Sequence, residues 1–341
     1  MAAHAPEGDP PRAATRTDVA RAAGVSTAVV SYVVNNGPRA VAPATRARVL
    51  AAMEELDYRP NALARALRMR SAQAVGLIVP DVSNLYFGAL ARELSNRAFD
   101  QGYAVLLGDA DNDVDRERAQ VDSLVGRQID GLLIVSLGDE LPASAENVPT
   151  VFLDQRDRPG RRSVVADDLD GAAQAVSHLI GHGRRRIALV NGPAGSPEAV
   201  QRERGWRETL DAAGLPHDES LIVRTEFSRA GGLDAALRLL SQDERPDAVF
   251  VASDVQALGV LAAARRLRLK VPDDLAVISF DGTEEAAFSD PPLTTVEVPI
   301  DRIAETALRA VLSPEPADAP TFVPVRLVIR ETCGCPEPTG G

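Results

Sequence analysis

The sequence predicts an α/β protein with two parts, a small helical module near the N-terminus and a larger body of two lobes, each built on a doubly wound sheet. Three observations predict this. The 341-residue length exceeds one ordinary domain. Short helical patterns precede Ala74, and from there runs of five to seven apolar residues alternate with amphipathic helical segments. An apolar content of 45% supplies side chains for more than one core.

The module is expected to hold three short helices. Thr17 is the expected N-cap of the first helix, which ends at Gly24. Ser26 is expected to cap a second helix that continues through Asn35. Pro43 then opens a third helix in its first turn. Three helices in so short a stretch predict a separate domain.

The second helix has two unlike faces when its residues are placed about 100° apart. One face is made of four valines, Val29, Val30, Val33 and Val34. The other consists of small or polar residues, Thr27, Ala28, Ser31, Tyr32 and Asn35. Short polar side chains allow close approach to a DNA groove and can bond phosphates or base edges. The pattern alone also fits an ordinary solvated helix, but the helix before it and the neighbouring arginines favour a helix-turn-helix.

Charge is distributed unevenly along the chain. The whole chain has a net charge of −12, whereas residues 15–73 carry nine arginines against four acidic residues, a local charge of +5. A basic head on an acidic body indicates that the head, and not the body, meets a polyanion.

The body is expected to form two lobes covered by helices. Its apolar runs, such as AVGLIVP, GLLIVS and LAVISF, are rich in Val, Ile and Leu and predict parallel strands that are buried on both faces. About ten strands exceed one comfortable sheet. Two sheets are therefore expected, with ligand chemistry between the lobes at the carboxyl ends of the strands.

Several long stretches resemble one known family. They include TRTDVARAAGVSTAVVSYVVNNGPRAVAPATRARVLAAMEELDYRPNALARALR, VGLIVPDVSNLYFGAL, GHGRRRIALVNGP and ISFDGTEEAAFSDPPLTTV. In order and extent, over residues 15–335, the chain is similar to the LacI/GalR family of bacterial transcription regulators. The resemblance implies a helix-turn-helix head with a hinge helix, followed by a two-lobed core of the type I periplasmic-binding-protein kind.

Composition, local patterns and the resemblance together give the expected domain boundaries. They are a disordered leader at 1–14, the helix-turn-helix domain at 15–60, a hinge helix and linker at 61–73, a first core lobe at 74–168 and 299–331, a second lobe at 169–298, and a tail at 332–341.

Residues that match the family's DNA-contacting positions are expected to bind DNA here. Phosphate contacts are implied for Thr17, Ser26, Asn35, Thr45 and Asn61, and base contacts from the face that holds Thr27, Ala28, Ser31 and Tyr32. Leu67 matches a leucine that enters the minor groove, with Arg65 and Arg68 beside it to neutralise phosphates. Tyr32 stands where many members have arginine, so a bidentate contact to guanine is not expected there.

The resemblance implies that a small-molecule effector binds between the lobes. The matching positions are Asn84, Tyr86, Phe87, Asp154, Arg202, Phe227, Asp254 and Asp281. Aromatic rings can stack on a sugar, and carboxylate or guanidinium groups can bind neighbouring hydroxyls. A sugar or related polyol is therefore the expected effector. From the residues alone, Asp254 and Asp281 could equally be helix caps, and Arg202 could belong to a surface ion pair.

The implied protein is a transcription regulator, most simply a repressor, that binds double-stranded operator DNA as a homodimer in the cytoplasm. No leucine heptads follow Glu331, which favours a dimer over a helix-tethered tetramer. The alternative is a solute-binding or sugar-processing α/β protein without a regulatory role. A solute-binding protein would need an export signal, and the sequence shows neither such a signal nor a membrane-spanning run. A sugar-processing protein would need a catalytic motif, and none is found.

No cofactor or metal site is expected. Cys333 and Cys335 are the chain's only cysteines, too few and too close together for a disulfide framework or a zinc site. His178 and His182 are four residues apart, but the neighbouring sequence offers no third ligand.

Overall fold

The chain divides into two units, Met1–Ala72 and Gln73–Gly341, in a computed structural model. The structure describes residues 14–35, 40–59, 71–138, 140–153, 161–313 and 320–335.

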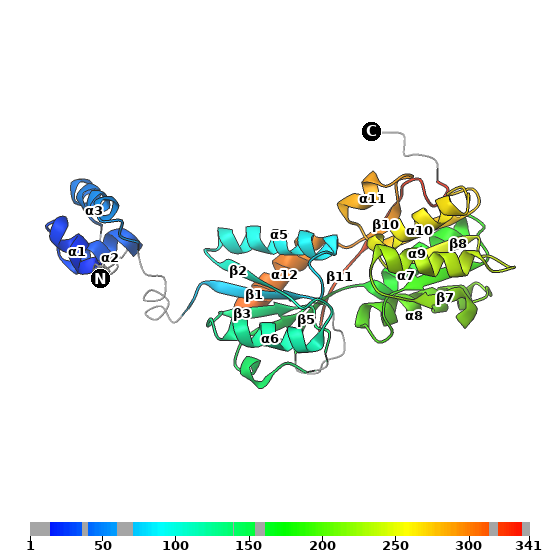
Figure 1. Cartoon of the computed structure of the whole chain (residues 1–341), viewed down its shortest axis with the longest axis horizontal. Helices are drawn as coiled ribbons and strands as arrows, with labels where there is room; N and C mark the ends of the chain where they lie inside the picture. Colours follow the sequence, from blue (N-terminus) through cyan, green and yellow to red (C-terminus); the bar gives the residue numbers. More distant parts are fainter. Residues whose placement is uncertain are drawn as a thin grey trace, which may run out of the picture. The chain divides into compact units, whose positions relative to one another are not determined.

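The first unit contains the three expected helices, α1 (Arg16–Ala22), α2 (Thr27–Asn35) and α3 (Pro43–Glu55) (Figure 1). Its core is formed by buried apolar residues from all three helices, Val19, Ala20, Ala23, Val30, Val33, Val49 and Ala52. Gly24, with φ of +63°, makes the turn between α1 and α2, a conformation that a residue with a Cβ rarely adopts. The predicted three-helix module is confirmed.

The first cap differs from the prediction. Thr15, not Thr17, is the N-cap of α1, because Thr15 and Asp18 form a reciprocal capping box. The amide of Asp18 donates to Thr15 Oγ1 at 3.4 Å, and the amide of Thr15 donates to Asp18 Oδ2 at 2.9 Å. Thr17 lies exposed in the first turn. At α2 the Ser26 hydroxyl accepts from the amide of Val29 at 3.3 Å, as expected of a cap.

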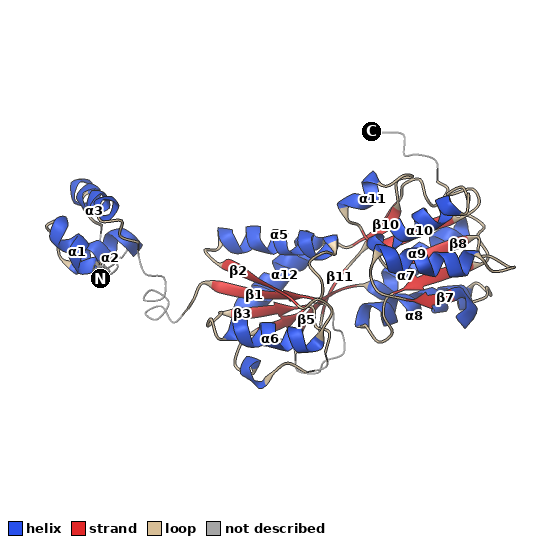
Figure 2. Ribbon diagram, in the orientation of Figure 1, coloured by secondary structure: helices blue, strands red, loops and turns tan. Residues whose placement is uncertain are grey.

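The first lobe of the second unit is a six-stranded sheet in the order β11-β5-β4-β3-β1-β2 (Figure 2). All of its pairings are parallel. The strands are β1 (Ala74–Val79), β2 (Ala104–Asp109), β3 (Gly131–Ile134), β4 (Thr150–Phe152), β5 (Arg162–Ala166) and β11 (Thr321–Val323). Its helical elements are α5 (Leu85–Asp100), α6 (Val114–Val125), η1 (Ala143–Ala145) and α12 (Ile300–Leu312).

The second lobe is a six-stranded sheet in the order β12-β10-β9-β8-β6-β7. Its strands are β6 (Ile187–Asn191), β7 (Ile222–Arg224), β8 (Ala248–Val251), β9 (Ala276–Asp281), β10 (Thr294–Glu297) and β12 (Arg326–Val328). Its helical elements are α7 (Asp168–Gly181), α8 (Pro197–Ala212), η2 (Glu219–Leu221), α9 (Arg229–Leu240), α10 (Asp254–Arg266) and α11 (Glu284–Phe288). β12 is antiparallel to β10, whereas the other pairings are parallel.

Continuous apolar runs produce this architecture. Every residue of β1, β3, β6, β8 and β9 is buried, as a strand between two helical layers must be. Helices cover both faces of each sheet (Figure 2). The predicted two-lobed α/β core is confirmed.

The place where the chain crosses for the last time from the first lobe to the second differs from the expected domain boundary. The segment 299–331 is expected wholly in the first lobe, but its final strand, β12, pairs with β10 of the second sheet. Residues 332–335, expected to belong to a tail, also pack on the second lobe, since Thr332 Oγ1 donates to the carbonyl of Val277 at 2.7 Å. The apolar run VPVRLVIR is divided between β11, which ends at Val323, and β12. The chain passes between the two sheets at residues 324–325.

Candidate functional site

A cavity of about 720 Å³ lies where loops from both lobes meet at the carboxyl ends of their strands. Six of the predicted effector residues line it: Asn84, Tyr86, Phe87, Arg202, Phe227 and Asp281. It is also lined by Ser253 and by polar residues that the sequence did not predict, including Asn112, Ser136, Asp168, Glu198, Glu226 and Ser228. The cavity therefore combines aromatic walls with several titratable groups.

The aromatic wall is built on the first turn of α5. Asn84 is the N-cap of this helix, and its Oδ1 accepts from the amide of Tyr86 at 3.1 Å. The rings of Tyr86 and Phe87 pack edge to face, with centroids 5.3 Å apart and planes at 74°. The cap thus fixes the turn that holds both rings at the cavity.

Arg202 is the centre of the polar wall. Its side chain on α8 is only 8% exposed. Its Nε and Nη2 both lie 3.0 Å from Asp168 Oδ1 at the start of α7, and its Nη1 donates to the carbonyl of Ala252. Nη1 also lies 3.7 Å from Asp281 Oδ1, and the guanidinium stacks 3.9 Å above the ring of Phe280. Arg202 is therefore a buried, oriented cation, and the surface ion-pair interpretation is wrong.

Three carboxyl groups surround this cation, on Asp168, Glu198 and Asp281. Burial raises the pKa of Asp281 well above its usual value, although Arg202 opposes the shift. Burial also raises the pKa of Glu198, again against Arg202. For Arg202, burial disfavours the charged form, but the three carboxylates outweigh it and the pKa is raised. One cation facing three desolvated acids leaves acceptor oxygens for hydroxyl donors of a ligand.

Asp254 does not line the cavity, contrary to the expectation that it contacts the effector. Its carboxylate accepts hydrogen bonds from three hydroxyls, those of Ser279, Thr283 and Thr295, and from the amide of Thr283 at 2.6 Å. Its own amide donates to Asp281 Oδ2 at 3.3 Å. Asp254 is thus a buried anchor behind the site that helps to place Asp281, and Ser253 is the N-cap of α10.

Phe227 is held against the cavity by close packing on a glycine. A Cβ added to Gly192 would lie 2.1 Å from Cζ of the Phe227 ring, so a side chain there would displace the ring. The loop beside Phe227 is fixed by Gln256, whose Nε2 donates to the carbonyls of Asn191 at 3.0 Å and Glu226 at 3.1 Å.

The wall opposite includes the loop after β3. Buried Glu117 on α6 accepts from the hydroxyl of Ser136 at 3.0 Å and from the amide of Leu137 at 2.6 Å. Both Ser136 and Leu137 line the cavity. Glu117 therefore positions this loop from outside the cavity.

The DNA-binding candidates in the first unit lie on the outer side of its helices. Val30 and Val33 of α2 are buried in the core, whereas Ser26, Thr27 and Ala28 are exposed. Ser31, Tyr32 and Thr45 are half-buried. The two-faced helix expected from the valine pattern is present, with its small polar face turned away from the core.

Some predicted positions lie outside the residues described in the structure. They are Asn61, Arg65, Leu67, Arg68 and Asp154, together with the side chain of Asn35.

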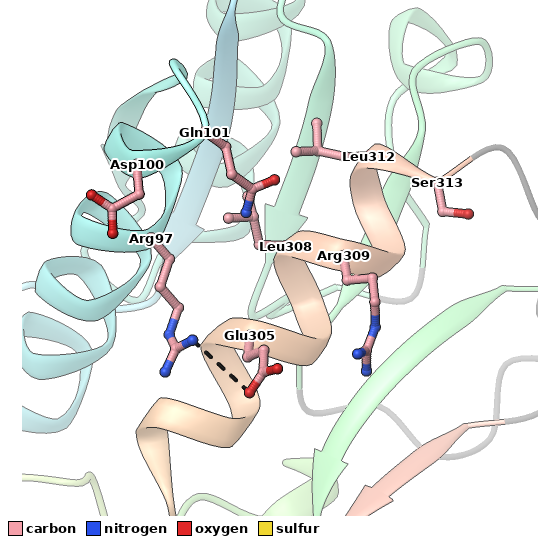
Figure 3. Close-up of a pocket in the computed structure, with 8 residues that line it drawn as sticks. All are labelled: Arg97, Asp100, Gln101, Glu305, Leu308, Arg309, Leu312 and Ser313. Atoms are coloured by element: carbon pink, nitrogen blue, oxygen red, sulfur yellow. Dashed lines mark ion pairs between the residues drawn. The ribbon is translucent and has the colours of Figure 1, made fainter.

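A second hollow, of about 510 Å³, lies between α5 and α12 (Figure 3). Nε of Arg97 on α5 lies 2.7 Å from Glu93 Oε1, and Nη1 of Arg97 lies 3.9 Å from Glu305 Oε2 on α12. This hollow shares no lining residue with the cavity between the lobes. The two are separate features.

Comparison with known proteins identifies the family. Residues 15–61 match the model of bacterial regulatory proteins of the lacI family, and residues 176–333 match that of the periplasmic-binding-protein-like domain. The ribose operon repressor of Escherichia coli is 37% identical over 301 residues, which cover 86% of this chain and 91% of that protein. The chain belongs to the LacI family.

Two solved structures of transcription regulators also resemble the chain. The lac repressor dimer bound to operator and the anti-inducer ONPF has a TM-score of 0.82 at 29% identity, covering 94% of this chain and 99% of that one. The transcriptional regulator CelR in complex with cellobiose has a TM-score of 0.70 at 29% identity, with the same coverage of both chains. Among the described residues of this LacI-family chain, no helix combines the length and apolar character needed to cross a membrane.

Proposed function

We propose that this LacI-family chain is a transcriptional repressor that binds operator DNA through its helix-turn-helix unit and responds to a sugar or related polyol bound between its lobes. The observation that carries the proposal is the pairing of two surfaces in one chain. One is the small polar face of α2, and the other is the cavity that holds Arg202 with three carboxyl groups.

DNA recognition is assigned to the outer face of α2. Thr27 and Ala28 are exposed and short, so the helix backbone can approach the floor of a major groove closely. Thr17 and Ser26, exposed near the N-termini of α1 and α2, are suited to phosphate oxygens. We assign the hinge contacts implied for Leu67, Arg65 and Arg68 to the same operator.

The chain acts as a homodimer in this proposal. Two copies would place two α2 helices on the half-sites of a pseudo-palindromic operator, about one helical turn apart. The lac repressor, which resembles this chain, is bound to its operator as a dimer, and that supports the same assembly here. Operator binding assigns the protein to the cytoplasm and gives it a regulatory role, not a catalytic one.

The effector is expected to be rich in hydroxyl groups. Asp281 and Glu198 can accept hydrogen bonds from a pair of hydroxyls, while Tyr86, Phe87 and Phe227 offer rings for the apolar face of a sugar. Arg202 has five N–H donors, more than its four contacts in the protein occupy. The names of the ribose operon repressor and the CelR–cellobiose complex support a carbohydrate.

Effector control follows from the cavity's construction from both lobes. A ligand that binds one arrangement of the lobes more tightly shifts the protein toward that arrangement. Bound effector then changes the affinity for operator by a certain factor. Bound operator changes the affinity for effector by the same factor.

A thermal-shift screen of the full chain against sugars, polyols and nucleobases tests the effector class. The proposal predicts that one or a few sugars or polyols raise the melting temperature and alter operator affinity. Stabilisation by a sugar with no operator binding under any condition would favour the alternative, a solute-binding or sugar-processing protein.

A further inference from the structure

The structure brings together two pairs of potential metal ligands, and the two pairs are far apart in the sequence. His178 lies in the last turn of α7 and His182 is its C-cap, whereas Cys333 and Cys335 follow β12. Their candidate ligand atoms all lie within 4.8 Å of one another. The Sγ of Cys335 is 3.1 Å from His182 Nε2 and 3.5 Å from His178 Nε2. Neither histidine and neither cysteine lines the cavity between the lobes.

Helix geometry and a glycine turn explain how the four groups converge. His178 and His182 are four residues apart, so their side chains lie one above the other on the same face of α7. Their ring centroids are 4.8 Å apart. Gly334 lies between the cysteines with φ of +99°, a conformation that an L residue rarely adopts, and this turn lets both thiols reach the histidines.

The cysteine segment is fixed to the second sheet from the other side. Thr332 Oγ1 donates to the carbonyl of Val277 at 2.7 Å and accepts from the amide of Thr294 at 2.8 Å. The carbonyl of Thr332 also accepts from the amide of Val277 at 2.8 Å. The backbone that carries Cys333 is therefore anchored to β9 and β10, and α7 supplies the histidines from a separate element.

The donor set and its spacing match one kind of metal ion. Two imidazoles and two thiols form the Cys₂His₂ set of tetrahedral structural zinc sites. With zinc bonds of about 2.0–2.3 Å, neighbouring ligand atoms of a tetrahedron lie roughly 3.3–3.8 Å apart. The distances from Cys335 Sγ to the two imidazole nitrogens, 3.1 and 3.5 Å, are within a few tenths of an ångström of this range. The widest separation between ligand atoms is at most 4.8 Å, so it would have to shorten by about 1 Å.

We propose that His178, His182, Cys333 and Cys335 bind one Zn²⁺ ion in a tetrahedral site that ties the segment after β12 to the end of α7. Cys333 is buried and His182 is exposed, so the site has a protected floor and an entrance from solvent. Arg184 is a nearby cation. Its guanidinium donates hydrogen bonds to the carbonyls of Pro272, Asp247 and Asp273, away from the four ligands. Binding closes a loop of more than 150 residues, which includes every strand of the second sheet.

The thiols provide a direct readout, because these two are the chain's only cysteines. The full chain is purified with reductant, dialysed against Zn²⁺ and then against metal-free buffer, and its metal content is measured by mass spectrometry. About one zinc per chain is expected, with both thiols unreactive to a thiol reagent until a chelator is added. Co²⁺ in place of zinc should give the visible bands of a tetrahedral ion and a thiolate-to-cobalt charge-transfer band.

Variants separate the site from general effects on folding. Cys335→Ser and His182→Gln, at two ligands that are not buried, should each reduce retained zinc to below roughly 0.2 per chain and abolish the cobalt bands. His217→Gln is the matched control, since His217 faces Trp206 and Asp211 elsewhere in the lobe. Zinc should raise the melting temperature of the parent chain by about 5 °C or more, and not that of the two ligand variants.

Three results would overturn the proposal. The first is a reduced, folded chain that retains no zinc and has two freely reactive thiols. The second is a disulfide between Cys333 and Cys335 that persists under the reducing preparation. The third is zinc retained equally by the parent, Cys335→Ser and His182→Gln, which would assign the metal to other groups.

Discussion

The guanidinium of Arg202 lies with both Nε and Nη2 3.0 Å from Oδ1 of Asp168, joining α8 to the first turn of α7 in the wall of the cavity. This ion pair is nearly solvent-free, with side-chain exposures of 8% and 7%. Its partners therefore hold each other in one orientation, and a ligand meets a preformed arrangement of donors and acceptors.

Replacing Arg202 with lysine is expected to weaken both effector binding and the fold. Lysine keeps the charge but cannot bond Asp168 and Asp281 with a planar fork. We expect effector affinity to fall about 10-fold or more and the unfolding free energy to fall by about 2 kcal/mol. Calorimetric titration and denaturant unfolding measure the two effects.

Arg204→Lys is the matched control in the same helix. Arg204 is 59% exposed and pairs with Glu208 across one helical turn, so the substitution should change neither quantity measurably. Equal losses of effector affinity for both variants would contradict the assignment of Arg202 to the site.

The contact between Gly192 and Phe227 gives a second prediction. Gly192→Ala places a methyl group where the Phe227 ring now lies, so the ring must move within the cavity wall. We expect effector affinity to change by at least about 10-fold, while operator binding without effector is retained. Gly181→Ala is the control because a Cβ there meets nothing within 4 Å. Unchanged effector affinity in Gly192→Ala would show that Phe227 takes no part in binding.

Burial of Asp281 predicts a pH-dependent stability. Its pKa is raised well above the usual value by desolvation, so the folded state holds its proton more tightly than the unfolded state. The stability that this proton contributes is present below the unfolded pKa of about 3.9 and is lost as pH rises through the folded pKa.

Asp281→Asn removes this contribution. The variant should therefore become more stable relative to the parent chain as pH rises from about 4 toward 7, while it loses effector affinity. Denaturant unfolding at several pH values measures the difference. A difference that stays constant over this range would contradict the assigned titration.

The exposed face of α2 predicts which substitutions weaken operator binding without unfolding the head. Thr27→Ala and Tyr32→Phe each remove one hydroxyl outside the buried core and should each cost about 0.5–1.5 kcal/mol of specific binding. Ala51→Ser, at an exposed position of α3, is the control. Anisotropy titration on operator and on scrambled DNA separates a specific loss from a general one. An equal loss on both DNAs would indicate phosphate contacts only.

Local sequence patterns predicted much of the fold and of the site. Valine spacing predicted the buried side of α2, and apolar runs predicted the two parallel sheets, because both depend on residues that are close in sequence. Most of the predicted effector residues line one cavity, because Asn84, Phe227 and Asp281 lie at or after the carboxyl ends of strands. Arg202 reaches the same cavity from within α8.

The errors depended on contacts between distant residues. The carboxylate of Asp254 accepts hydrogen bonds from the hydroxyls of Ser279, Thr283 and Thr295. These residues are far from Asp254 in the sequence, so its local sequence did not predict the contacts. The two cysteines reach His178 and His182 only because β12 crosses to the second sheet. By contrast, the T-x-x-D pattern of Thr15 and Asp18 was visible in the sequence and could have identified the first cap.

The most direct test of ligand-controlled operator binding is a titration of the full chain on labelled DNA from upstream of its own coding sequence. Scrambled DNA of the same length is titrated beside it, over a series of salt concentrations. We expect tighter binding to the upstream DNA, with the logarithm of affinity falling linearly with the logarithm of salt concentration. We also expect the sugar or polyol that stabilises the chain to change this affinity. Equal affinity for both DNAs at every salt concentration, unaffected by that ligand, would contradict ligand-controlled operator binding.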